Sequence, residues 1–124
     1  AAPLHIYLAG ELGVGKTFWV QSLLAALGEQ QRVRSPSYAL VYSYQIGALT
    51  IHHFDCYRLQ GAPIGDDLLE LLEQEALCLL EWHEQASNLP AADLYLNFSF
   101  AASARVIQAE AASEQGEKLL CAFT

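Results

Sequence analysis

The segment from residue 10 to residue 17 has the residue types of a phosphate-binding loop. It reads Gly-Glu-Leu-Gly-Val-Gly-Lys-Thr and matches G-x-x-x-x-G-K-[ST] at every fixed position. Glycines let the backbone curl so that successive N–H groups point at phosphate oxygens, with no Cβ in the way. Lys16 would reach the β- and γ-phosphates of a nucleotide, and the Thr17 hydroxyl would be a ligand of Mg²⁺. The spacing therefore predicts a nucleotide-phosphate site.

The segments on either side of this loop predict the strand and the helix that such a loop connects. Residues 4–9 form an apolar, strand-like run. The following segment presents Phe18, Leu23 and Leu27 at near-helical spacing, and Gly28 stands where a helix C-cap is expected. The amino end of this helix would add its partial positive charge to the phosphate site.

Two acidic residues follow apolar runs farther along the chain. Asp55 comes after the strand-like segment 49–54, and Glu81 comes after the continuous apolar run 76–80. Ligands of open α/β sheets bind outside the carboxyl ends of the strands. A phosphate-loop enzyme needs a carboxylate near Mg²⁺ and a group that orients the attacking water. Each acid fits either role, and for each the alternative is an ordinary solvated carboxylate at a strand end.

The remaining patterns predict a small mixed sheet. The fold class expected is α/β, P-loop NTPase-like, with flanking helices and added antiparallel strands, and we expect residues 1–124 to form a single domain. The predicted elements are an antiparallel hairpin over 32–55, a helix over 65–75, a buried parallel strand over 76–82, an alternating strand over 93–100 with Leu94, Leu96, Phe98 and Phe100 on one face, and short strands over 104–111 and 117–124 joined by a turn near Gln115 and Gly116.

The composition limits the classes of partner. Fourteen acidic residues against six basic ones give a net charge of −8, and a chain this acidic is a poor independent binder of nucleic acid. No apolar run of about 18 residues predicts a membrane span. The three cysteines, Cys56, Cys78 and Cys121, are widely spaced and form no C-x-x-C pair. This usage is typical of reduced thiols in a cytoplasmic protein.

Four segments taken in order resemble one protein family. They are GELGVGKT, RSPSY, HFDCYRL and LLEW, and together they resemble the bacterial TsaE (YjeE) family. That family is an ATPase needed to make the threonylcarbamoyl modification on adenosine 37 of certain tRNAs. The resemblance covers most of the chain from Leu4 to Pro90. The phosphate loop is specific by itself, whereas the other segments are specific only as an ordered set.

The resemblance implies roles for individual residues. Lys16 and Asp55 would be catalytic, with Asp55 aligning or activating the attacking water. Thr17 and Glu81 would hold Mg²⁺, Glu81 through water. The residues expected to contact ATP or ADP are Glu11, Leu12, Gly13, Val14, Gly15, Lys16, Thr17, Phe18, Ser37 and Trp82.

The chain departs from the family pattern at several places. Ser37 stands where the family has a switch-like threonine in S-P-T, so the hydroxyl is kept and a methyl group is lost. Arg58 matches the arginine of the family's D-L-Y-R. Phe18 directly follows Thr17, where the family loop reads G-K-T-T-F, and the chain contains no methionine. A methionine absent at that place would restore the register. Family members begin with an additional helical segment, which we expect to be missing here.

The function implied is that of a Mg²⁺-dependent ATPase that serves as an accessory to a tRNA-modifying complex. Its hydrolysis would reset or cycle that complex. The resemblance names the TsaB and TsaD subunits as partners. Because the chain is acidic, we expect tRNA to be held by those partners and not by this chain.

Two other functions remain compatible with the sequence. A nucleotide-binding switch would use the same loop without hydrolysis, and it differs only in whether Asp55 and Glu81 position water. A small-molecule kinase needs several cations over the transferred phosphate and a lid that excludes water. No lid-like insertion is visible in the sequence, and the arginines are Arg32, Arg34, Arg58 and Arg105.

Several other side chains have simpler interpretations. His52 and His53 are adjacent on a predicted strand and point to opposite faces, so with His83 they favour structural roles over a metal site. Trp19 is expected in the core. Arg105 lies on a late strand that could reach a nucleotide, but we expect a surface role for it.

Overall fold

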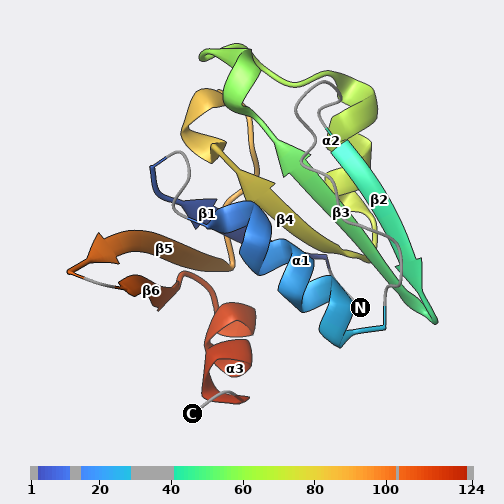
Figure 1. The fold of residues 1–124 in the computed structure, drawn as a ribbon. Helices are drawn as coiled ribbons and strands as arrows, with labels where there is room; N and C mark the ends of the chain where they lie inside the picture. The colour runs from blue at the N-terminus through green and yellow to red at the C-terminus, as the bar shows by residue number, and fades with distance from the viewer. Residues whose placement is uncertain (1–2, 12–14, 29–40, 103, 123–124) are drawn as a thin grey trace.

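The computed structural model describes residues 3–11, 15–28, 41–102 and 104–122, with the side chain of Arg58 excepted. Its six-stranded sheet has the order β2-β3-β4-β1-β5-β6 (Figure 1). The elements are β1 (Leu4–Ala9), α1 (Lys16–Ala26), β2 (Val41–Ile46), β3 (Leu49–Asp55), η1 (Tyr57–Leu59), α2 (Asp66–Glu73), β4 (Leu77–Glu81), η2 (His83–Gln85), β5 (Leu94–Ala101), β6 (Ala104–Ala111) and α3 (Glu114–Ala122).

The centre of the sheet is parallel and both edges are antiparallel. Strand β1 pairs in parallel with β4 and β5, and β3 pairs in parallel with β4. Strands β2 and β6 add antiparallel edges to β3 and β5. The predicted mixed α/β sheet is therefore confirmed. The buried parallel strand predicted over 76–82 is also confirmed: β4 covers Leu77–Glu81 and lies between two parallel neighbours.

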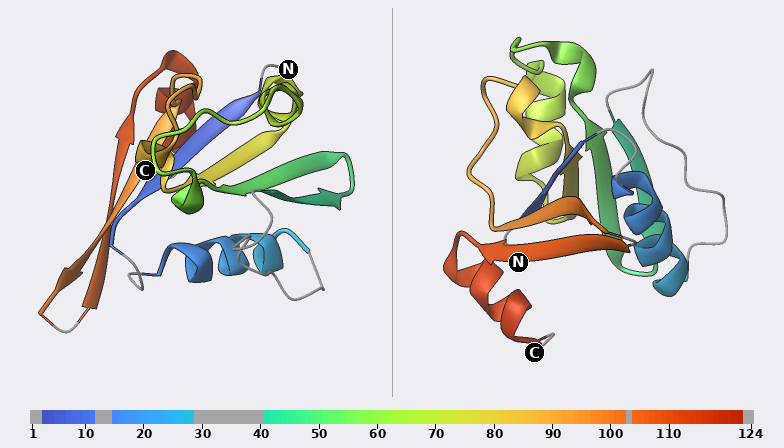
Figure 2. Two further views of the ribbon diagram at one scale, coloured as in Figure 1. Left: turned by 90° about the horizontal axis from the view of Figure 1, so that it is seen from above. Right: turned by 60° about the vertical axis from the view of Figure 1, so that its left-hand side comes forward.

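Each face of the sheet has its own apolar cluster, because successive strand residues point to opposite sides. Ile51 and Leu79 belong to the cluster under α1, whereas Phe54 and Leu80 belong to the cluster under α2. Figure 2 shows α1 and α2 on opposite faces of the sheet. This alternation also decides which polar residues at the strand ends face α1.

Helix α1 begins at Lys16, within the phosphate-loop motif, and buries a different set of residues from the one expected. Its buried apolar residues are Val20 and Leu24. Phe18 is 69% exposed and Leu27 is 39% exposed, so these two residues do not anchor the helix. Trp19, as predicted, packs against the α1-side core. The helix ends before Gly28, whose φ of 107° is accessible to glycine at little cost.

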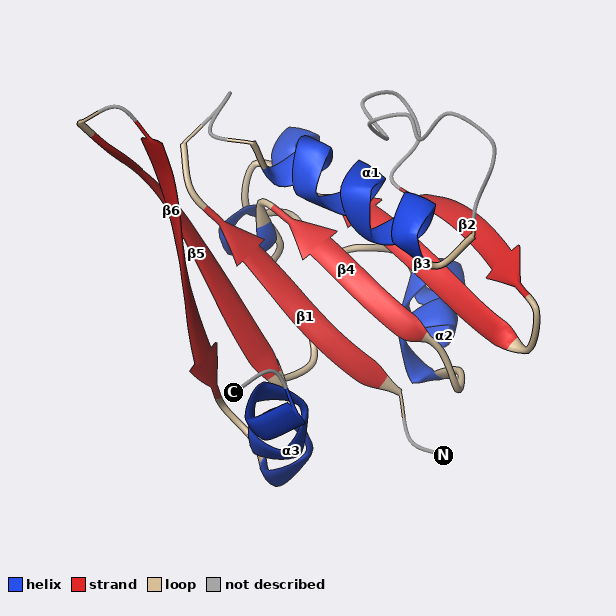
Figure 3. Cartoon of the chain, turned by 60° about the horizontal axis from the view of Figure 1, so that its bottom comes forward, coloured by secondary structure: helices blue, strands red, loops and turns tan. Residues whose placement is uncertain are grey.

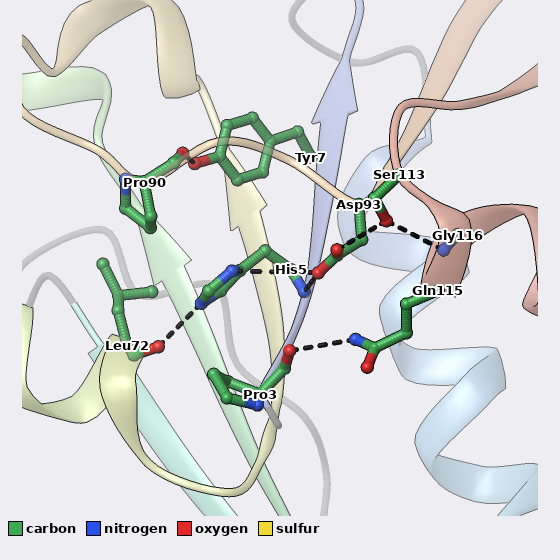
Figure 4. Close-up of polar contacts among 9 residues, drawn as sticks. All are labelled: Pro3, His5, Tyr7, Leu72, Pro90, Asp93, Ser113, Gln115 and Gly116. Atoms are coloured by element: carbon green, nitrogen blue, oxygen red, sulfur yellow. Dashed lines mark hydrogen bonds and ion pairs between the residues drawn. The ribbon is translucent and has the colours of Figure 1, made fainter. Parts of the chain in front are cut away.

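The end of the chain is a helix, so the predicted strand over 117–124 and its turn at Gln115 and Gly116 are wrong. Figure 4 shows the contacts that fix the start of α3. Gly116 N–H donates to Ser113 Oγ at 3.0 Å, a side-chain cap, and Ser113 Oγ donates to Asp93 Oδ1 at 2.7 Å. A Cβ on Gly116 would lie 1.8 Å from the backbone oxygen of Asp93. The glycine therefore permits close helix packing instead of forming a hairpin turn.

The hairpin of β5 and β6 extends beyond the centre of the sheet (Figure 3). The pairing of β1 with β5 ends at Ala9 and Asn97, whereas the pairing of β5 with β6 continues to Ala101. Phe98 is buried, as predicted, but Phe100 is 57% exposed because β1 no longer runs beside it. Among the residues that the structure describes, no helix is long and apolar enough to cross a membrane.

Candidate functional site

The parallel strands bring the candidate site residues to one edge of the sheet. Asp55 is the register partner of Glu81, and Leu8 of β1 lies on the other side of Glu81. The carboxyl ends of β1, β3 and β4 therefore meet where the chain enters α1. Of the expected nucleotide contacts, Leu12, Gly13, Val14 and Ser37 lie outside the described residues.

Thr17 and Glu81 meet at this edge. The Thr17 hydroxyl lies 3.3 Å from each of the two carboxylate oxygens of Glu81, and Glu81 is 3% exposed. The two residues come from the first turn of α1 and the last position of β4. A hydroxyl and a carboxylate are oxygen donors of the kind that Mg²⁺ prefers. The side chains present therefore fit the cation that the loop motif implies.

Lys16 is held inside the protein. Its ammonium donates to the backbone oxygen of Gly10 at 2.7 Å and lies 3.8 Å from the centre of the Trp82 ring. Burial lowers the pKa of Lys16, while the negative charges of Glu81 and other nearby acids oppose that shift. The side chain thus reaches from the first residue of α1 back to Gly10, beside an aromatic ring.

Trp82 lies directly after β4 and is strained. Its φ of 57° places a bulky residue in the left-handed region, which costs about 1–2 kcal/mol. Its ring makes an edge-on contact with Tyr57, with ring centres 4.8 Å apart. This conformation holds the indole against the ammonium of Lys16.

Asp55, the last residue of β3, lies at the same edge of the sheet. Its Oδ1 accepts the backbone N–H of Tyr57 at 3.0 Å. Burial raises the pKa of Asp55, and the neighbouring Glu81 carboxylate adds to that rise, whereas the bond from Tyr57 lowers it. A half-buried carboxylate with one oxygen held by the backbone leaves its other oxygen to orient a small polar molecule.

His53 is a site residue that the sequence did not reveal. Its Nε2 lies 2.5 Å from Oε2 of Glu81, and the imidazole is completely buried. His53 and Asp55 are two positions apart on β3, so they share the face that α1 covers. His52 points to the other face, where it contacts Ser43 and Gln74. The expectation that the adjacent histidines diverge is confirmed, and the partner of His53 is the proposed Mg²⁺ residue.

The other expected contacts within the described residues are Glu11, Gly15 and Phe18. Glu11 is exposed, and the exposed Phe18 ring points away from the core. Gly15 precedes α1 with a φ of 110°, a conformation that glycine adopts without strain. The side chain of Arg105, from β6, lies across the Cα of Gly15.

Comparison with known proteins gives the family. The family model described as "Threonylcarbamoyl adenosine biosynthesis protein TsaE" matches residues 1–108. The chain belongs to the TsaE family. The TsaE protein of Haemophilus influenzae is 35% identical over 124 residues, which cover 98% of this chain and 78% of that protein. The TsaE protein of Treponema pallidum is 37% identical over 91 residues, covering 68% of this chain and 64% of that protein.

A solved structure supports the same TsaE assignment. The crystal structure of Bacillus subtilis YdiB matches with a TM-score of 0.77 at 27% identity, and the match covers 98% of this chain and 78% of that one. The P-loop-type fold expected from the sequence is therefore confirmed. The TsaE proteins with which the chain was compared are named for tRNA threonylcarbamoyladenosine biosynthesis, which is the process to which the family belongs.

Proposed function

We propose that this TsaE chain is a Mg²⁺-dependent ATP-binding and ATP-hydrolysing accessory protein of the complex that makes N6-threonylcarbamoyladenosine at position 37 of tRNA. The observation that carries the proposal is the convergence of Lys16, Thr17, Glu81 and Asp55 at one edge of the sheet. These side chains come from three elements, so their meeting does not follow from the loop motif alone. One cation and three oxygen-bearing groups are what phosphoryl transfer to water requires.

The proposal assigns each side chain a distinct task. Lys16 exchanges the backbone oxygen of Gly10 for nucleotide phosphate oxygens, which carry full negative charge and so bind the ammonium more strongly. Thr17 and Glu81 hold Mg²⁺, which when bound neutralises charge on the phosphates. His53 fixes the orientation of Glu81 from behind. Asp55 orients the attacking water with the carboxylate oxygen that Tyr57 does not hold.

The charge of the chain and its family membership support a proposal about its partners. A net charge of −8 repels the phosphate backbone of tRNA, so the substrate nucleic acid must be held by another subunit. We propose that TsaB and TsaD are those subunits and that this chain docks on them. Nothing in the proposed constellation transfers a carbamoyl group, so hydrolysis here would drive the cycle of the complex.

ATP turnover tests the proposal directly. We would measure phosphate release by the chain alone and with TsaB and TsaD, using wild type, Asp55→Ala and the exposed control Glu70→Ala. The proposal expects partner-stimulated hydrolysis that Asp55→Ala abolishes and Glu70→Ala preserves. Tight ATP binding without hydrolysis in any mixture would instead establish a nucleotide-binding switch. Phosphate recovered on a small molecule would establish a kinase.

A further inference from the structure

A serine and a histidine form a hydrogen-bonded pair on the face of the sheet that lies away from the phosphate loop. Ser43 of β2 and His52 of β3 are register partners in an antiparallel pair, so their side chains stand on the same face. The Ser43 hydroxyl lies 2.7 Å from Nδ1 of His52. Phe54, two positions after His52, belongs to the apolar cluster under α2. The pair therefore lies on the α2 side, across the sheet from α1.

Gln74 determines which nitrogen of His52 carries the proton. The side-chain oxygen Oε1 of Gln74 lies 3.1 Å from Nε2 of His52. An amide oxygen only accepts hydrogen bonds, so Nε2 of the neutral imidazole is the protonated nitrogen and donates to it. Nδ1 then has a free lone pair, and the Ser43 hydroxyl donates to that lone pair. The serine oxygen is thus placed beside a base that can take its proton.

The burial of these side chains suits a nucleophile and its base. His52 is 3% exposed, whereas Ser43 lies at an exposed position on β2, the strand that ends the described sheet (Figure 1). Both ring nitrogens of His52 are held, and its ring lies edge-on to Phe54, with ring centres 6.4 Å apart. The imidazole is therefore fixed in one orientation, while the serine can be reached from solvent.

We propose that Ser43 is a base-activated nucleophile that takes an acyl group from activated esters, with His52 as its general base and Gln74 as a positioning residue. A nucleophile within hydrogen-bond reach of a base that a third group orients is the arrangement that activates serine for acyl transfer. His53 and Asp55 of the proposed nucleotide site point to the other face of β3. The acyl-accepting site therefore goes beyond the proposed function and does not depend on it.

The reaction is a transfer in which nothing is oxidised or reduced. The Ser43 oxygen attacks the carbonyl carbon of the ester, and the hydroxyl proton passes to Nδ1 of His52. The bond from the carbonyl carbon to the leaving oxygen then breaks, and the leaving group departs with the bonding electron pair. His52 releases the proton from Nδ1 to the leaving group or to water. The products are an ester on Ser43 and the free leaving group, and the proton on Nε2 stays with Gln74 as its acceptor.

The reagent p-nitrophenyl acetate tests this reaction, and peptide mass spectrometry locates the acetyl group. Ser22 is the internal reference in the same sample, because its exposed hydroxyl donates to the backbone oxygen of Phe18 at 3.0 Å and a carbonyl oxygen is not a base. We expect Ser43 to be acetylated about 100-fold faster than Ser22, at the lower end of what a general base contributes. Equal rates at the two serines would overturn the proposal.

Variants of His52 and Gln74 separate a base from a merely structural contact. His52→Gln should reduce the rate at Ser43 to that at Ser22, because an amide takes no proton. Gln74→Leu should lower the rate several-fold, because it removes the acceptor that keeps the proton on Nε2. Gln74→Glu should raise it several-fold, because a carboxylate accepts more strongly and favours the imidazolium.

The exposed position of Gln74 keeps the test decisive if His52→Gln fails to fold. Gln108→Glu is the matched control, since it adds the same charge at an exposed position on β6 and should leave the rate at Ser43 unchanged. If Gln74→Glu does not exceed wild type, or Gln108→Glu raises the rate equally, the proposed role of His52 is overturned. The experiment contains no nucleotide, so its failure would leave the proposed ATPase function intact.

Discussion

The imidazole of His53 lies 2.5 Å from the carboxylate of Glu81, and these side chains are 0% and 4% exposed. The same carboxylate lies 3.3 Å from the Thr17 hydroxyl on its other side. Glu81 is thus held between a strand residue behind it and a helix residue in front of it. A carboxylate fixed in this way loses little conformational entropy when a cation binds on the side that faces Thr17.

Removal of His53 should be strongly destabilising, because the buried Glu81 carboxylate loses its imidazole partner and keeps only the longer contact with the Thr17 hydroxyl. We expect His53→Ala to lower the free energy of unfolding by about 3–5 kcal/mol, measured by urea denaturation. His52→Ala is the matched control, since this buried neighbour has only neutral partners and should cost less. In a Glu81→Gln background the cost of His53→Ala should fall. An equal cost in both backgrounds would show that packing, not the pair, is responsible.

Thr17 should contribute strongly to Mg²⁺ binding and little to the stability of the fold. Thr17→Val keeps the shape of the side chain and removes the hydroxyl that faces Glu81. We expect ATP affinity in EDTA to stay near the wild-type value and the gain in affinity on adding Mg²⁺ to fall by about tenfold or more. Calorimetric titrations with and without Mg²⁺ measure both quantities. Thr17→Ser, which keeps the hydroxyl, should retain the gain, and a loss there would contradict a role as ligand.

The charged carboxylate of Asp55 should destabilise the folded state at neutral pH. Burial raises the pKa of Asp55 above its ordinary value of 3.8, so the folded state binds the proton more tightly than the unfolded state does. The cost of the charged carboxylate is therefore absent below that ordinary value and appears as pH rises through the raised pKa. Asp55→Asn should be more stable than wild type at pH 7 by up to about 1 kcal/mol.

Urea denaturation of both proteins from pH 7 down to pH 4 tests this sign. The advantage of Asp55→Asn should shrink as the pH falls, because wild type then takes up the proton. The asparagine oxygen can still accept the backbone N–H of Tyr57, so that contact is preserved. An advantage that is constant with pH would show that titration of Asp55 is not its cause.

Gly116 should tolerate no side chain, although it lies inside a helix. Alanine usually stabilises a helix by about 0.5–1 kcal/mol relative to glycine. Here the added Cβ would overlap the Asp93 backbone oxygen at 1.8 Å, so α3 must move away from the start of β5. We expect Gly116→Ala to lower the free energy of unfolding by about 1–3 kcal/mol. Glu117→Ala, at the exposed neighbouring position, should be nearly neutral; an equal loss there would show that the overlap with Asp93 is not the cause.

The loop and the strands could be predicted because their signals are local. The glycines, Lys16 and Thr17 are contiguous in the chain, and β1 and β4 are apolar runs of the length and composition of buried strands. Asp55 and Glu81 could be placed at one edge because parallel strands end together. The buried face of α1 was predicted less well, because Phe18 and Leu27 have helical spacing but do not face the core.

The C-terminal helix and two of the site contacts depended on tertiary structure. The segment 114–122 has short apolar runs that fit a strand or a helix, and the contact of Gly116 with Asp93 belongs to the helix. His53 and Glu81 are 28 positions apart, and Arg105 reaches Gly15 only because β5 and β6 lie on the far side of β1 from β4. The sequence by itself determined the phosphate loop and the types of its reactive groups, because backbone conformation and residue chemistry are local properties. Only the order and register of the strands, which no local period specifies, decided which side chains meet.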